Sequence, residues 1–235
     1  MRAEFLSHVG AVRENNEDAI YCDVKSGVFV VADGIGGKEA GEIASATAVR
    51  VVAEKSWEDP DAEPAVMLRE AFYEANNFIY NRGKEPGMAG MGTTMTAAVV
   101  RGNKITIVHV GDSRAYLINK KSIRQLTEDH SLVAQLVKDG QIKPEEARHH
   151  PRRNILLRAI GQEALVEVDV VEAEWHKGDY LLLCTDGLFN LVIEEEMQEI
   201  TMRVAELQTA VEFLAETAFN RGGYDNISLV LVAHD

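Results

Sequence analysis

The stretch VFVVADGIGG, residues 28–37, joins five consecutive apolar residues to an aspartate and three glycines. A short apolar run rich in β-branched residues, bounded by turn residues, is typical of a strand buried on both faces. Asp33 directly follows this run, and a carboxylate at the end of a buried strand costs free energy unless it is paired or bound to a metal. Gly34, Gly36 and Gly37 would let the backbone approach a metal closely. A plain turn after a strand would use the same residues.

On both sides of this stretch the apolar pattern alternates between the period of strands and the period of helices. The ranges with a strand pattern are 4–9, 19–23, 28–32, 93–100, 105–110, 115–118, 123–126, 166–173, 180–184 and 227–232. The ranges with a helical pattern are 40–57, 65–80, 131–160, 194–202 and 207–219. Strands therefore come in runs and helices in pairs, without the strict alternation of a parallel sheet. This order predicts an α+β fold in which helices cover two packed, mostly antiparallel sheets.

Composition and charge restrict the classes of protein that fit. The chain has 235 residues, of which 46% are hydrophobic and 26% are charged, as in one globular domain. No apolar run approaches the roughly 20 residues that a membrane-spanning helix needs, and the start, with Glu4, is unlike a secretory signal. The net charge of −14 argues against a nucleic-acid partner. We expect a cytoplasmic protein in which Cys22 and Cys184 are reduced core thiols.

Four aspartates lie at strand ends, beside glycine or in a turn. Asp33 and Asp186 follow apolar strands, Asp112 lies between two strands, and Asp225 precedes the last strand. One such residue is usually a helix cap or a turn residue. Four that converge would repel one another and raise one another's pKa unless cations were bound. Oxygen ligands suit magnesium or manganese, and Cys–His spacing typical of structural zinc is absent from the sequence.

A cation and two further carboxylates lie in one turn-like segment between the first two strands. Arg13 can grip two phosphate oxygens in the plane of its guanidinium group, and Glu17 and Asp18 follow within five residues. A surface ion pair would explain the same residues.

The chain resembles the metal-dependent protein phosphatases of the 2C type, the PPM family, and especially its small bacterial members. The resemblance covers essentially the whole chain in the order of the family's motifs. These motifs are VGAVRENNEDA (9–19), VVADGIGG (30–37), GMGTTMTAAVV (90–100), HVGDSRAYL (109–117), LTEDHSLV (126–133), NILLRAIG (154–161), LLLCTDGL (181–188) and GGYDNISLVLV (222–232).

This resemblance implies a four-layer α-β-β-α sandwich with a metal site at one edge of the sheets. It implies that Asp33 bridges two Mn²⁺ or Mg²⁺ ions, with the backbone carbonyl of Gly34 as a further ligand. Asp186 and Asp225 would hold the first ion with Asp33, and Glu17 would lie near the second through water.

The remaining roles also follow from the resemblance. Asp18 would orient the bridging water, Arg13 would hold the substrate phosphate, and Asp112 with Asp186 would take a third ion. The reaction would be hydrolysis of phosphoserine and phosphothreonine in proteins by a metal-bridged hydroxide, without a phosphoenzyme. Ile35 stands where animal members have a histidine proposed as the general acid, so the acid for the leaving group is unassigned.

The resemblance further implies one domain over residues 1–235, a flap around 139–160 that shapes substrate choice, and action as a monomer against a bacterial serine/threonine kinase. The flap holds a dense basic cluster of Arg148, Arg152 and Arg153, although a solvated helical surface would also contain such residues. Three alternatives stay open: a two-metal phosphoesterase of small phosphates, a catalytically silent binding module, and a regulatory phosphatase of the sporulation or stress type.

Overall fold

Alternation along one strand creates the layers of the molecule. The computed structural model describes residues 1–36, 40–57, 59 and 61–235. In strand β3 (Val28–Ile35), successive side chains point to opposite faces of the sheet. Val28, Val30 and Ala32 pack into a core under helices, whereas Phe29 and Val31 pack against the second sheet. Both faces are therefore buried, as the apolar run predicted.

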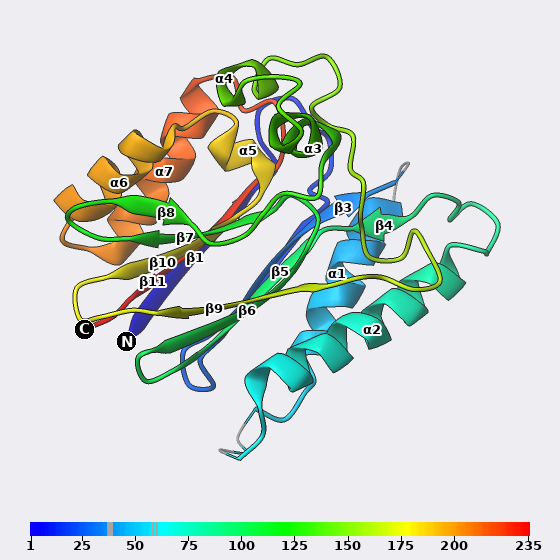
Figure 1. Cartoon of the computed structure of the whole chain (residues 1–235), viewed down its shortest axis with the longest axis horizontal. Coiled ribbons are helices and arrows are strands. Elements are labelled where there is room, and N and C mark those ends of the chain that lie inside the picture. The colour runs from blue at the N-terminus through cyan, green and yellow to red at the C-terminus, as the bar shows by residue number, and fades with distance from the viewer. Residues whose placement is uncertain (37–39, 58, 60) are drawn as a thin grey trace.

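Two sheets form the centre of the molecule (Figure 1). The five-stranded sheet has the order β1 (Arg2–His8), β11 (Ile227–Ala233), β10 (Tyr180–Cys184), β7 (Arg114–Ile118) and β8 (Ile123–Gln125). The six-stranded sheet has the order β2 (Asp18–Asp23), β3, β5 (Met95–Arg101), β6 (Lys104–Val110) and β9 (Asp169–Glu174), with β4 (Gly92–Thr93) beside β3. The strand pairings among the described residues are antiparallel.

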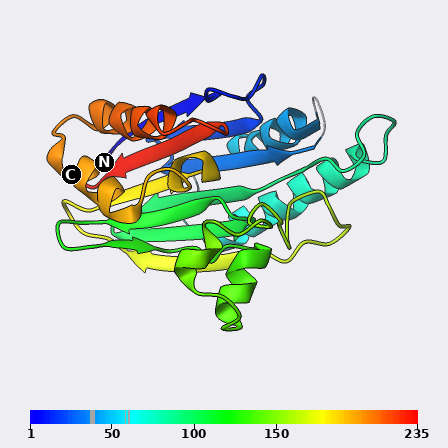
Figure 2. The same cartoon turned by 90° about the horizontal axis from the view of Figure 1, so that it is seen from above.

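Helices cover the outer face of each sheet (Figures 1 and 2). The six-stranded sheet is covered by α1 (Ala40–Ala53) and α2 (Pro64–Arg82). The other is covered by α5 (Asp186–Phe189), α6 (Glu194–Arg203) and α7 (Leu207–Asn220). A third apolar core lies between the sheets. The predicted four-layer α-β-β-α sandwich is confirmed. Its three apolar cores hold the four layers together.

The helical interpretation of residues 131–160 was wrong for most of that segment. Only α3 (Leu132–Lys138) and α4 (Pro144–Ala147) are helical there. Helix α3 ends before Gly140, whose φ of 69° is left-handed, and Pro144 then begins α4. Beyond residue 153 the backbone is not helical, since it bonds sideways to other segments instead. The NH of Leu157, for example, donates to the carbonyl of His130 at 2.8 Å.

Other boundaries moved by a few residues. Strand β9 begins at Asp169 rather than at residue 166, and the short helix α5 was not predicted. The expectation for Gly37 lies outside the described residues. Within the described part of the chain, no helix combines the length and apolar character needed to cross a bilayer.

Candidate active site

Two carboxylates face each other where β2 and β3 pair. Asp18 and Asp33 are directly opposite in the antiparallel register, a position where like charges repel. The backbone holds them there, because the NH of Gly34 donates to the carbonyl of Glu17 at 3.0 Å. The NH of Asp33 donates to the hydroxyl of Thr94 at 2.9 Å. This end of the six-stranded sheet therefore imposes the close approach of the two side chains.

The other sheet contributes Asp186 through a threonine that joins the sheets. The hydroxyl of Thr185 donates to Oδ2 of Asp18 at 2.8 Å, and the NH of Thr185 donates to the carbonyl of Ser228 at 3.0 Å. Asp186 follows as the first residue of α5. A Cβ on Gly187 would lie 2.0 Å from the carbonyl oxygen of Asn226, so only glycine lets α5 pack this closely on the start of β11.

Asn226 fastens the Arg13 segment to the same edge. Its amide donates to the carbonyls of Val9 and Asn15, both at 2.9 Å, and its Oδ1 accepts from the NH of Glu17 at 2.8 Å. Arg13 is thereby brought to Asp225, and Nη2 of Arg13 lies 2.8 Å from Oδ2 of Asp225. The predicted phosphate-binding cation and a predicted metal ligand thus form an ion pair in this structure.

The electrostatics of the site show five aspartates that act on one another. Burial raises the pKa of Asp33 well above its usual range, and the charges of Asp18, Asp186, Asp112 and Asp225 raise it further. Burial likewise raises the pKa of Asp112, with Asp186 adding to the effect.

The carboxyls of Asp18 and Asp186 respond to the same environment. Burial raises the pKa of Asp18 to about 7 and that of Asp186 to about 6. Burial also raises the pKa of Glu17, which lies beside Arg13. A site with this much unfavourable charge calls for a cation.

The oxygen atoms of the site fit hard divalent ions. Oδ1 of Asp18 and Oδ1 of Asp186 are buried and accept no hydrogen bond from the described residues. Such atoms cost free energy unless a ligand engages them. Within the described ranges, no group of three or more His, Cys, Asp or Glu side chains is already placed to hold a metal ion. One of the predicted ligands, Asp225, is paired with Arg13 instead.

Cavities connect these carboxylates with the predicted flap. A cavity of about 630 Å³ is lined by Arg13, Asp186 and Asp225 together with Arg148 and Arg153. A smaller one of about 240 Å³ is lined by Asp112 and Asp186 together with the same two flap arginines. Arg152 is not among the residues that line either cavity.

The residues proposed from sequence therefore meet at one edge. Asp18, Asp33, Asp112, Asp186 and Asp225 interact directly, and Arg13 joins Glu17 to them. Gly34 directly follows Asp33, and a Cβ on Gly34 would approach the carbonyl oxygen of Gly41 to 2.2 Å.

Sequence reasoning missed the residues that position this set, above all Thr185, Asn226 and Asp129. Asp129 holds the part-buried Arg114 near Asp112. Nη2 of Arg114 donates to Oδ2 of Asp129 at 2.7 Å. The signal for Thr185 and Asn226 was their position directly beside Asp186 and Asp225, which a turn pattern alone does not distinguish.

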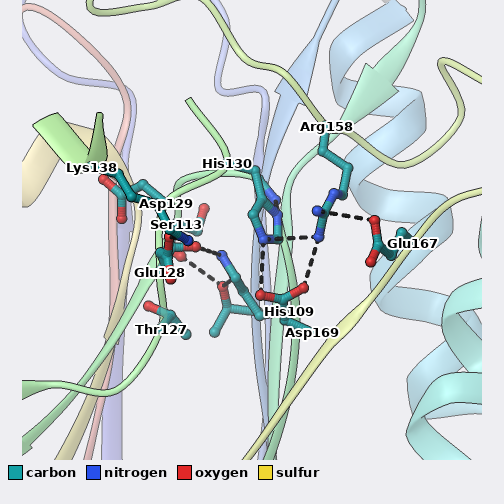
Figure 3. A network of polar contacts seen from close by, with 12 residues as sticks. His109, Ser113, Thr127, Glu128, Asp129, His130, Lys138, Arg158, Glu167 and Asp169 are labelled. Carbon is teal, nitrogen blue, oxygen red and sulfur yellow. Dashed lines mark hydrogen bonds and ion pairs between the residues drawn. The ribbon is translucent and has the colours of Figure 1, made fainter. Parts of the chain in front are cut away.

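Two histidines belong to a separate network (Figure 3). Burial lowers the pKa of His109 to about 3 and also lowers the pKa of His130. Nδ1 of His130 accepts from the NH of Gly111 at 3.1 Å, so its Nε2 holds the proton and faces Oδ2 of Asp169 at 3.2 Å. Arg158 binds the other oxygen of Asp169 at 2.7 Å. These contacts indicate that both histidines have a structural role.

The cysteines are unsuited to nucleophilic chemistry. Cys22 and Cys184 are free thiols, and Cys184 is buried. Burial raises the pKa of Cys22 to about 11 and raises that of Cys184 further, which keeps both protonated at neutral pH.

Comparison with known proteins assigns the chain to a family. The family model "Protein phosphatase 2C" matches residues 7–221. The serine/threonine phosphatase stp of Listeria monocytogenes is 41% identical, and the match covers 100% of this chain and 96% of that protein. The protein phosphatase PhpP of Streptococcus pneumoniae is 38% identical, with 99% and 97% covered.

Solved structures agree with the sequence matches. The Mycobacterium tuberculosis serine/threonine phosphatase PstP/Ppp superposes with a TM-score of 0.92 at 37% identity, covering 98% of this chain and 97% of that one. The catalytic domain of PstP in complex with two manganese ions gives a TM-score of 0.89 at 35% identity, with 98% and 96% covered. With the site geometry and the match over nearly the whole length, the chain belongs to the protein phosphatase 2C family.

Proposed function

We propose that this chain is a metal-dependent phosphatase that hydrolyses phosphoserine and phosphothreonine in proteins. One observation carries the proposal: five aspartates from both sheets meet at one edge, beside Arg13. A phosphate dianion would be repelled by this edge unless divalent cations inverted its field. The relatives that match over the full length are named serine/threonine phosphatases, which supports the class of substrate.

The metal ligands in this proposal are the residues predicted from sequence. Asp33 would bridge two Mn²⁺ or Mg²⁺ ions, with Asp186, Asp225 and the carbonyl of Gly34 as further ligands and Glu17 nearby through water. Asp112 and Asp186 would take a third ion. The oxygen-only donor set and the two buried carboxylate oxygens without partners support this assignment. When bound, such ions supply an activated water and neutralise charge on the phosphoryl oxygens.

The protein's own residues then have distinct tasks. Arg13 would bind the phosphate with its guanidinium fork, which requires that its contact with Asp225 be exchanged for the substrate. Asp18 would orient the attacking water, and its position is fixed because Thr185 donates to its Oδ2 at 2.8 Å. The described active-site residues do not single out an acid for the leaving group, and Ile35 cannot serve as one.

Two competing functions would place different requirements on the site. A phosphoesterase of small phosphates would use the same metals but no flap, whereas Arg148 and Arg153 line the cavities beside the metal-binding aspartates. A silent binding module would have lost ligands, yet every predicted carboxylate is present at the site. The regulatory phosphatases of the sporulation or stress type remain a variant of the same chemistry.

The biological setting is also part of the proposal. The substrates would be phosphoproteins of a cognate bacterial serine/threonine kinase, and the chain would act as a cytoplasmic monomer over residues 1–235, with a flap around 139–160. The free thiols of Cys22 and Cys184 support a reducing compartment.

The activity itself gives the first prediction. Purified protein with Mn²⁺ or Mg²⁺ should release phosphate from a phosphothreonine peptide, and excess chelator should abolish the release. Asp225→Ala should lower kcat/KM by at least about a hundredfold, since even outer-shell partners of metal sites cost ten- to a hundredfold. The exposed Asp61→Ala serves as the matched control and should leave kcat/KM within about twofold. Activity that persists in chelator, or in Asp225→Ala, would contradict the metal mechanism.

The raised pKa values give the second prediction, on metal-free protein. Asp18 and Asp186 keep their protons to about pH 7 and about pH 6 in the folded state but lose them near pH 4 when unfolded. The folded state thus binds more protons between these values, so stability falls as pH rises from about 4 to 7. Asp33→Asn removes one buried charge, and it should raise Tm at pH 8 in chelator by about 3–10 °C.

Asp23→Asn is the control for this measurement. Asp23 lies at the far end of β2 from Asp18, and a hydrogen bond from Ser26 lowers the pKa of Asp23. It should not raise Tm at pH 8. Thermal unfolding followed by circular dichroism gives both values. If Asp33→Asn and the wild type unfold at the same temperature at pH 8, the carboxylates do not carry the electrostatic cost described.

The flap gives the third prediction. Arg153→Glu places a negative charge in the cavity beside Asp186 and Asp225, so it should lower kcat/KM on a phosphoprotein about tenfold. On para-nitrophenyl phosphate the loss should be smaller, because that substrate makes few contacts beyond the phosphate. Arg152→Glu is the matched control, with the same change of charge one residue away. Equal losses on the two substrates in Arg153→Glu would refute a role of the flap in substrate choice.

A further inference from the structure

A third cavity, of about 600 Å³, lies beside the candidate active site. One wall is Ile35, at the end of β3, and the other is the segment 154–167. The apolar residues that line it are Ile35, Leu156, Leu157, Ala159, Leu165 and Val166. Leu157 is 55% exposed and Leu165 is 88% exposed, large values for leucines that line a concave surface. Pockets of this size and character hold ligand side chains in many proteins.

The wall that contains Leu157 is held in place on both sides by hydrogen bonds. The NH of Leu157 donates to the carbonyl of His130 at 2.8 Å, and Ile160 and Thr93 exchange two backbone hydrogen bonds of 2.8 and 3.0 Å. Beyond it, Asn76 accepts from the NH of Gly161 at 2.7 Å and donates to the carbonyl of Glu163 at 3.0 Å. The cavity is therefore formed before any ligand arrives, which lowers the cost of binding.

Figure 3 shows what anchors the residue next to Leu157. Nη1 of Arg158 lies 2.7 Å from Oδ1 of Asp169, and Nη2 of Arg158 lies 3.2 Å from Oε2 of Glu167. The charge of Arg158 is thus matched by two carboxylates, so it adds no free cation to the cavity. Glu167 is already paired with Arg158, and the exposed Glu163 adds negative charge to the lining. The cavity combines apolar walls with an acidic border.

This cavity adjoins the cavities of the active site through one shared lining residue. Asn154 lines it and also lines both cavities that contain Asp186. On the opposite side, Ile35 is separated from Asp33 only by Gly34. A peptide whose phosphate lay at Arg13 and Asp186 could therefore cross Asn154 and reach the apolar walls within a few residues, at about 3.3–3.6 Å per extended residue.

We propose that this cavity is a substrate subsite that binds an apolar side chain of the phosphoprotein close to its phosphorylated residue, with Leu157 as a specificity-determining residue. The inference rests on the proposed protein phosphatase function and names the substrates it favours. A leucine or similar side chain fills the apolar walls, because burial of apolar surface is favourable. An acidic residue at the same place is disfavoured by Glu163.

The test uses phosphothreonine peptides in which a single leucine is moved through the three positions on either side of phosphothreonine, on an otherwise glycine and serine background. Matched sets have aspartate in place of leucine. The wild type with Mn²⁺ should prefer leucine at one or two adjacent positions about tenfold in kcat/KM over the background peptide, and aspartate there should be the poorest. Hydrolysis of para-nitrophenyl phosphate measures the chemistry without the subsite.

Leu157→Ser should remove most of that preference through KM, with kcat unchanged, since it deletes binding that is common to the ground and transition states. Ile155→Ser is the matched control: Ile155 is 43% exposed, two residues away, and does not line the cavity. It should keep the preference, and neither variant should alter hydrolysis of para-nitrophenyl phosphate.

The outcomes separate the two claims. Peptides cleaved at equal rates whatever the position of leucine, or a preference that survives Leu157→Ser, would overturn the subsite and leave the phosphatase function intact. Equal losses on peptides and on para-nitrophenyl phosphate in Leu157→Ser would overturn it as well, because they indicate general damage. Hydrolysis of para-nitrophenyl phosphate without cleavage of any phosphopeptide would overturn the protein phosphatase function and the subsite with it.

Discussion

Mutual repulsion among five aspartates at one edge of the sheets is the constraint on which the rest of this structure depends. Asp18 and Asp33 face each other across β2 and β3, and Asp112, Asp186 and Asp225 complete the set from neighbouring turns. Buried carboxylates so close together can keep protons or bind cations, and both responses oppose the free-energy cost of the charge. Only the second response yields a site that attracts phosphate. The acidic character of the chain, with a net charge of −14, makes this local inversion of the field essential.

The sandwich supplies the rigidity that such a site requires. Three apolar cores hold the two sheets and their helices, and polar contacts then join the sheets at the site itself. Thr185 links Asp18 to β11, while Asn226 ties the Arg13 segment to the same strand end. These contacts fix the aspartates on the scaffold, while Arg13 and the flap can respond to substrate. The cavity beyond Asn154 extends the same surface toward the flanking residues of a peptide.

Much of this was predictable from sequence, for physical reasons that also explain the failures. The strand that contains Phe29 is a continuous apolar run, and the helices over 40–57 and 65–80 have strong helical periodicity. All three elements were confirmed apart from shifts at their ends. The segment 131–160 was wrongly predicted to be helical throughout, because its charged and apolar residues follow a helical pattern. Its backbone conformation is set instead by Gly140 and by lateral hydrogen bonds to Thr93 and His130. Periodicity contains no information about such tertiary contacts.

The candidate site shows the same division. The motif aspartates were found because a carboxylate next to glycine at a strand end is costly and therefore conspicuous. Their assembly at one edge required the order of strands in both sheets, which local pattern does not supply. Thr185 and Asn226 escaped notice because a single threonine or asparagine in a turn is ordinary. The ion pair of Arg13 with Asp225 could not be foreseen either, since 212 positions separate the two residues.

The central claim is that the buried aspartates give up protons to bind divalent cations. Calorimetric titration of the metal-free protein with Mn²⁺ near pH 6.5, in two buffers with different ionisation enthalpies, measures this directly. The account predicts saturable binding with net release of protons, because the pKa values of Asp18 and Asp186 are raised to about 7 and about 6 and fall when a cation binds. Asp33→Asn should weaken the binding and reduce the release. Tight binding with no difference between the buffers, or no binding at all by a folded protein, would contradict it.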